Sequence, residues 1–107
     1  MKILQTIKYY EPSKGGMESV AKNLANGIKI VRRNYNLKVV CNNHLISTKN
    51  IKEQLNSIDI FRYKSFFYKS QPISFRFKGL SKDLKDADVI HHHYPYPTME
   101  LALLRNL

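Results

Sequence analysis

Residues 1–31 predict a strand, a glycine loop and a helix in that order, and no other feature of the sequence restricts the fold as much. Residues 2–7 are mostly apolar and typical of a strand, and Gly15 and Gly16 lie in the loop that follows. Apolar residues then recur at the spacing of one helix face: Met17, Val20, Ala21, Leu24, Ala25, Ile28 and Val31. A strand joined to an amphipathic helix in this way indicates an α/β fold.

The rest of the chain continues the alternation of strands and helices. Residues 37–41 predict a second strand, and residues 51–63 predict either a hairpin or a short helix followed by a strand. The alternation within residues 58–63 is typical of an outer strand with one face only partly buried. Residues 75–86 favour a short helix, and residues 101–107 lie in a last helix. We therefore predict a Rossmann-like parallel sheet with flanking helices.

Three histidines follow the last predicted strand. Residues 87–90 predict a strand buried on both faces, and the prolines that come after the histidines end it. His91, His92 and His93 therefore stand at its carboxyl end, where open parallel α/β sheets bind ligands. Because side chains alternate along a strand, His91 and His93 share one side and His92 faces the other.

Gly15 and Gly16 precede the first helix, and two interpretations of them are open. Adjacent glycines can adopt positive φ and present successive backbone N–H groups, which with the positive end of the helix dipole would bind a phosphate. A plain tight turn is the alternative, because the spacing matches neither a Walker loop nor the dinucleotide-binding fingerprint.

The chain is strongly basic, with 18 Lys and Arg residues against 8 Asp and Glu residues and a formal net charge of +10. This charge favours anionic partners, although a Lys- and Asn-rich composition is also typical of an AT-rich genome. Residues 63–78 interleave aromatic and cationic side chains, which suits single-stranded nucleic acid, an anionic bilayer interface, or a loop that covers the sheet. Among external partners we expect an anionic membrane surface and no nucleic acid.

Cysteine content and hydropathy indicate the cellular compartment of the protein, and the residues around the histidines bear on metal binding. Cys41 is the single cysteine, which excludes an internal disulfide, indicates a small buried residue and suggests a reducing compartment. There is neither a signal peptide nor a run of about 18 apolar residues, so we expect a cytoplasmic protein whose membrane contact is peripheral. Three consecutive strand histidines cannot converge on one ion, and no nearby Cys or carboxylate pair has zinc spacing, so we expect no metal and no cofactor.

Three stretches in order resemble the opening signatures of the retaining GT-B glycosyltransferases of family 4. They are residues 2–4, residues 11–18 and residues 88–93. Residues 70–74 and 95–101 are also similar to stretches in family members that build bacterial surface polysaccharides. The resemblance covers most of the chain, and the joint order of the motifs makes it specific.

The resemblance implies transfer of a sugar from a nucleotide-sugar donor to a lipid-linked or saccharide acceptor. Such enzymes have two Rossmann-like domains across a cleft, so residues 1–107 would belong to the acceptor-side N-terminal domain, with the donor-binding C-terminal domain absent. The resemblance also implies that Gly15 and Gly16 contact a donor or acceptor phosphate, and that His93 reaches the transferred sugar. The family needs no divalent ion.

Two other functions fit the same sequence. A small basic module would bind nucleic acid or an anionic membrane without catalysis, and a truncated gene product would have no activity. The last apolar turn has no Gly or Asn cap after it, which favours a natural protein that continues beyond Leu107. An incomplete sheet with an open edge also favours self-association.

Overall fold

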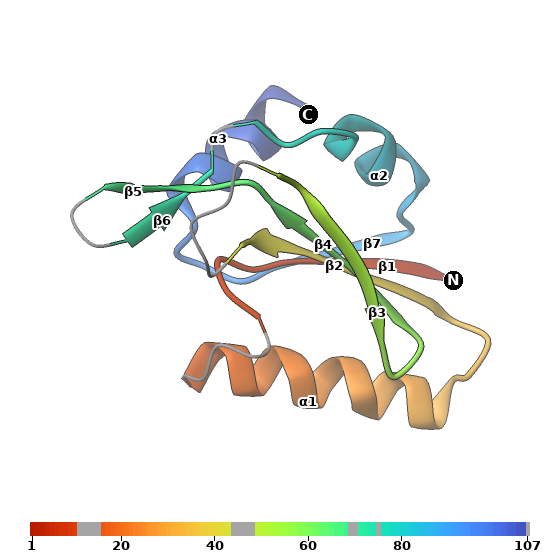
Figure 1. The fold of residues 1–107 in the computed structure, drawn as a ribbon. Helices are drawn as coiled ribbons and strands as arrows, with labels where there is room; N and C mark the ends of the chain where they lie inside the picture. Colours follow the sequence, from red (N-terminus) through yellow and green to blue (C-terminus); the bar gives the residue numbers. More distant parts are fainter. Residues whose placement is uncertain (11–15, 44–48, 69–70, 75, 107) are drawn as a thin grey trace.

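The computed structural model describes residues 1–10, 16–43, 49–68, 71–74 and 76–106. Its elements in chain order are β1 (Lys2–Thr6), α1 (Gly16–Val31), β2 (Asn36–Asn42), β3 (Ile51–Leu55), β4 (Ile58–Tyr63), β5 (Phe66–Tyr68), β6 (Gln71–Ile73), α2 (Leu80–Asp86), β7 (Val89–His92) and α3 (Pro97–Arg105). β5 and β6 form a small sheet of their own, and the other five strands form the main sheet (Figure 1).

The main sheet has the strand order β3-β4-β2-β1-β7. β1 pairs in parallel with β2 and with β7, β2 pairs in parallel with β4, and β3 is antiparallel to β4. The four parallel strands therefore have the 3-2-1-4 order of a Rossmann-like half, and the order reverses between β1 and β7. The predicted α/β fold with flanking helices is confirmed, but the sheet is mixed rather than wholly parallel.

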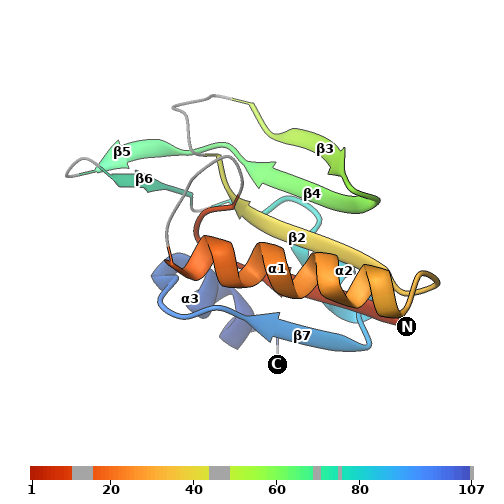
Figure 2. The same cartoon turned by 90° about the horizontal axis from the view of Figure 1, so that it is seen from below.

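The helices cover both faces of the main sheet. α1 lies along one face, and α2 and α3 lie on the other (Figures 1 and 2). Each face has its own apolar cluster because successive side chains of a strand point to opposite faces. The cluster under α1 includes Ala25, Val39 and Ile60, whereas the cluster under α2 and α3 includes Val40 and Tyr96.

Residues 51–63 form a hairpin, one of the two predicted alternatives. Asn56 and Ser57 join its strands with φ angles of 52° and 64°, as in the two-residue turns whose twist matches that of a hairpin. The expectation that residues 58–63 form an outer strand is wrong. β3 pairs with the outer edge of β4, and five of the six β4 residues are buried.

β7 is an edge strand of the main sheet, which contradicts the expected strand buried on both faces. It pairs with β1 and with no other described strand. Val89 and Ile90 are consequently 43% and 45% exposed. Apolar, β-branched residues predicted the strand itself correctly, but its burial depends on which strand pairs beside it.

α1 buries a narrower stripe than its apolar residues suggest. Ala21 and Ala25 are fully buried, whereas Val20 and Val31 are 60% and 67% exposed. The side chain of Met17 lies outside the described part of the structure. The helix therefore contacts the sheet through Ala21 and Ala25, with the partly buried Ile28 packed beside them.

Part of the aromatic and cationic segment 63–78 belongs to the core. Tyr63 is fully buried, and its ring centroid lies 4.9 Å from that of Phe77. α2 follows and ends at Asp86 as predicted, while Phe75 lies outside the described residues. Phe77 thus covers the sheet as that interpretation predicts, whereas Tyr63 is a core residue of β4 itself, and membrane binding by the segment stays a prediction.

Cys41 is a buried core residue of β2, as expected. Burial raises the pKa of its thiol to about 12, so the thiol is an unreactive packing group at neutral pH. The sulfur lies 3.8 Å from Nη1 of Arg62, a buried guanidinium that also pairs with Glu53 of β3. These contacts join β2, β4 and β3 on the α1 side of the sheet.

Candidate functional site

The carboxyl ends of β1 and β7 meet where the strand order reverses. The chain leaves β1 toward α1 on one face of the sheet and leaves β7 toward α3 on the other face (Figures 1 and 2). At such a point the two connections diverge, and open α/β sheets bind ligands in the crevice beyond the strand ends. His91 and His92 pair here with Gln5 and Thr6 of β1, and His93 follows directly.

His93 is held in place by β1. Its backbone N–H donates to the carbonyl oxygen of Thr6 over 2.8 Å, which continues the pairing one residue beyond the strand. Its Nε2 lies 2.8 Å from Oε1 of Gln5, and His93 and Gln5 are only 8% and 1% exposed. The imidazole and the amide therefore fix each other in one orientation.

The Gln5 amide has one polar atom without a partner. Its Nε2 is buried and forms no hydrogen bond with any described residue. Reversing the amide would pair its nitrogen with His93 and leave its oxygen unpaired, so one unpaired atom remains in either orientation. A buried polar group without a partner costs about 1–3 kcal/mol, which makes Gln5 a candidate ligand contact.

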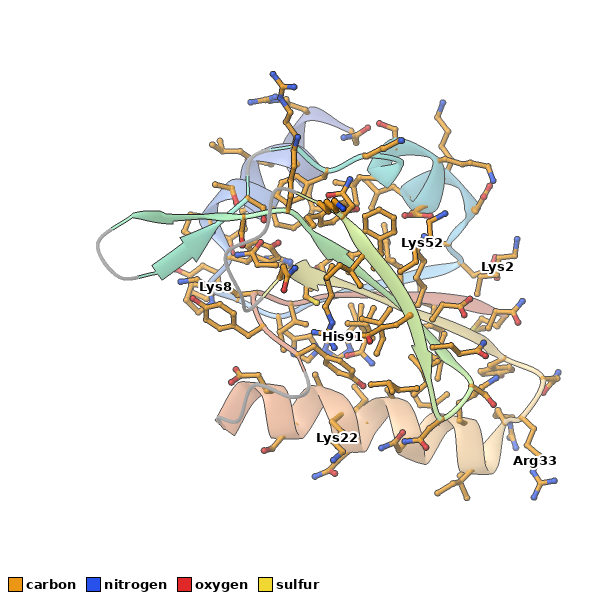
Figure 3. The ribbon with its side chains drawn as sticks, in the orientation of Figure 1. Lys2, Lys8, Lys22, Arg33, Lys52 and His91 are labelled. Carbon is orange, nitrogen blue, oxygen red and sulfur yellow. The ribbon has the colours of Figure 1, made fainter. Side chains whose placement is uncertain are left out.

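His91 stacks on His93 on the side of the sheet that faces α1 (Figure 3). The ring centroids are 4.5 Å apart and the ring planes differ by 11°, so the two histidines share one side as predicted. Burial, followed by the charges of His91 and His92, lowers the pKa of His93 from its ordinary value. His93 is therefore neutral at pH 7, and its ring offers one N–H group and one bare nitrogen.

His92 faces the other side and belongs to a chain of hydrogen bonds. Oγ1 of Thr6 lies 2.6 Å from its Nδ1, and Oε2 of Glu100 lies 2.9 Å from its Nε2. The same carboxylate oxygen accepts the backbone N–H of Tyr96 over 2.8 Å at the start of α3. Threonine, histidine and glutamate also form nucleophilic sets, but Thr6 is fully buried. We therefore assign these residues the role of tying α3 to β1 and β7.

Glu100 makes the stability of this link depend on pH. The hydrogen bond with His92, and then the bond from the Tyr96 backbone, lowers the pKa of the Glu100 carboxyl below its ordinary 4.5. A carboxyl with a depressed folded pKa stabilises the fold above its unfolded pKa, and this contribution disappears as the pH falls through the folded pKa. We expect Glu100→Gln to lower the urea midpoint near pH 7 and to have almost no effect once the pH lies below the lowered pKa of the Glu100 carboxyl. An equal effect at both pH values would contradict the assignment.

Gly16 is the first residue of α1, and its backbone corrects part of the phosphate hypothesis. The expected positive φ is wrong, because φ of Gly16 lies outside the left-handed region. A Cβ added there would meet no atom within 4 Å, so the space around Gly16 is open. Gly15 lies outside the described residues. What supports a phosphate site is position, since α1 begins at the end of the sheet where β1 and β7 finish (Figure 1).

A second polar contact at this end joins β2 to the loop after β7. Tyr96 is 1% exposed, and its O–H donates to Oδ1 of Asn42 over 2.5 Å. Neither this pair nor Gln5 was predicted from the sequence. A signal existed for each, because a glutamine or asparagine in an otherwise apolar strand needs a partner once it is buried.

Neither a metal cluster nor a bilayer-spanning helix is found among the described residues. No group of three His, Cys, Asp or Glu side chains within the described ranges could hold a metal ion. No described helix combines the length and the apolarity of a bilayer span. Comparisons of the chain with protein-family models, with curated proteins and with solved structures find no match.

Proposed function

We propose that this chain is the acceptor-side part of a retaining GT-B glycosyltransferase, which moves a sugar from a nucleotide-sugar donor to a lipid-linked or saccharide acceptor. The observation that carries the proposal is the pair of His93 and Gln5 at the reversal of strand order. The resemblance assigns the sugar contact to this strand end. A neutral, nearly buried imidazole that an amide holds in place is suited to orient a hydroxyl group.

In this proposal His93 and Gln5 bind one hydroxyl group of the transferred sugar. The bare ring nitrogen of His93 accepts a hydrogen bond from the hydroxyl group, and the unpaired amide atom of Gln5 forms a second hydrogen bond. Such bonds are stronger at a buried position than in water because the local dielectric is low. Ligand binding would also remove the cost of the unpaired amide atom.

The start of α1 binds a phosphate of the donor or the acceptor in this proposal. The first backbone N–H groups of a helix have no intrahelical partners, and the helix dipole is positive at that end. Gly16 stands at this start with open space around it, and Gly15 precedes it. Backbone N–H groups can hold a phosphate without a metal ion or a charged side chain.

The proposal also accounts for the exposed edge of β7. Further strands of a complete domain would cover Val89 and Ile90, which are 43% and 45% exposed. In this proposal the natural protein continues beyond Leu107, and its second domain closes the cleft. The enzyme would act in the cytoplasm at the inner face of the cell membrane, and residues 1–107 alone would associate through the open edge.

The test compares residues 1–107 with a longer product of the same gene. Both are incubated with a panel of nucleotide sugars and with lipid and saccharide acceptors, and products are detected by mass spectrometry. We expect transfer by the longer chain only, because one wall of a cleft neither holds the nucleotide nor excludes water. Turnover by residues 1–107 would refute the two-domain proposal. Lack of transfer by both chains, with salt-sensitive binding of any single strand, would favour the basic binding module.

A further inference from the structure

A basic hollow of about 570 Å³ lies over β2, β3 and β4, on the face of the sheet that carries α2. We call it the lysine groove. The residues that define it are Lys38, Lys52, Phe61, Lys78, Lys82 and Asp83. It shares no residue with the site formed by His93 and Gln5, which lies at the ends of β1 and β7.

The sheet fixes two of the four lysines. Lys52 is the cross-strand partner of Phe61, and it lies on the side of the sheet that faces α2 (Figure 3). Lys38 comes from β2, the strand on the other side of β4. The Nζ atoms of Lys52 and Lys38 lie 5.9 Å and 5.6 Å from the centroid of the Phe61 ring, within the range of a cation–π contact. Both ammonium groups are thus held near one ring rather than spread over the surface.

The other two lysines come from the turn before α2 and from α2 itself. Gly79 has a φ of 80°, a left-handed conformation that glycine adopts without strain. Lys78 and Lys82 lie on either side of this turn in sequence, and both line the groove. The turn and α2 therefore add two cations to the groove that Lys38 and Lys52 already line.

The described residues do not balance the charge of the lysine groove. Lys38 donates to Oδ1 of Asp83 over 2.8 Å, and Lys82 lies 3.6 Å from a carboxylate one helical turn away. Lys52 and Lys78 form no ion pair with any described residue. Gathering like charges costs free energy through their mutual repulsion, and a bound anion would remove that cost.

We propose that the lysine groove binds a phosphate-bearing ligand whose negative charges are shared among its lysines. Lysine binds phosphate as a mobile point charge with three N–H donors. The volume falls within the range of small-molecule sites, and the hollow has Phe61 as its floor, so a compact phosphate group fits it better than an extended strand of nucleic acid. The proposal goes beyond sugar transfer and does not depend on it.

Pyrophosphate is the probe, titrated into residues 1–107 at low salt by calorimetry. The test variant carries Lys52→Ser and Lys78→Ser, two exposed positions whose loss leaves the core intact. The control variant carries Lys64→Ser and Lys85→Ser, which removes the same charge from exposed lysines outside the groove. We expect the Kd to rise about tenfold in the test variant and less than about twofold in the control.

Vesicles of phosphatidic acid in phosphatidylcholine distinguish the source of the phosphate. Groove-dependent binding of these vesicles in competition with pyrophosphate would identify a lipid headgroup, and binding of pyrophosphate alone would identify a free phosphorylated molecule. Equal losses in the two variants would overturn the proposal, because net charge alone would then explain binding. It would also be overturned by a wild-type chain that binds neither probe, or by an oligonucleotide that binds more tightly and in a groove-dependent way.

Discussion

Replacing Tyr96 with alanine should lower the free energy of unfolding by about 3–5 kcal/mol, as measured by urea denaturation. Tyr96 is 1% exposed, and its ring lies edge-on to that of Phe77 with centroids 6.0 Å apart. Alanine would leave a cavity in the apolar cluster between the sheet and α3 and would remove the O–H that donates to Asn42. Domains of this size have a total stability of only about 5–15 kcal/mol, so a substantial fraction of the variant should unfold at low denaturant.

Tyr94→Ala is the matched control for this change. Tyr94 lies in the same loop but is 74% exposed, so its loss should alter the free energy of unfolding by less than about 0.5 kcal/mol. Tyr96→Phe keeps the ring and removes only the hydroxyl, and it should cost about 1 kcal/mol. If Tyr94→Ala and Tyr96→Ala lowered the free energy of unfolding equally, the result would contradict the packing of this loop against β2.

The sequence predicted which segments form helices and strands better than it predicted which strands lie side by side. The period of α1 and the apolar runs of β1 and β2 are local properties, so they can be recognised from residue order. Strand adjacency is not local. Because Asn56 and Ser57 form the turn between β3 and β4, β3 pairs with the outer edge of β4, and β4 becomes an inner strand instead of the expected outer one. Val89 and Ile90 form an edge for the same reason, although their residue types are typical of a central strand.

The candidate site was predictable in position but not in composition. The prolines after the histidines end the strand, and alternation places His91 and His93 together, so both conclusions follow from residue order. Gln5 becomes informative only through the register of β1 with β7, which places its amide beside His93. Glu100 likewise depends on the approach of α3 to β7, a tertiary contact that no local pattern records.

In the complete transferase that we propose, His93→Ala should lower kcat/KM per folded molecule about a hundredfold, because the reacting sugar loses an oriented contact. It should also lower the free energy of unfolding by about 1–3 kcal/mol, since the buried Gln5 amide loses its partner. The wild-type rate should fall as the pH drops through the pKa of His93, which lies below 6.5, because protonation removes the bare nitrogen. His93→Ala should abolish this loss of activity in acid.

His92→Ala is the control, because His92 belongs to the same strand end but binds Thr6 and Glu100 on the other side. It should destabilise the fold, since the fully buried Thr6 hydroxyl loses its partner, while kcat/KM per folded molecule stays within about twofold of the wild type. Only a contact with the reacting sugar would separate the two variants in this way. Equal losses of activity per folded molecule would mean that both histidines merely support the strand end. A loss of activity in acid that persists in His93→Ala would assign the titration to another group.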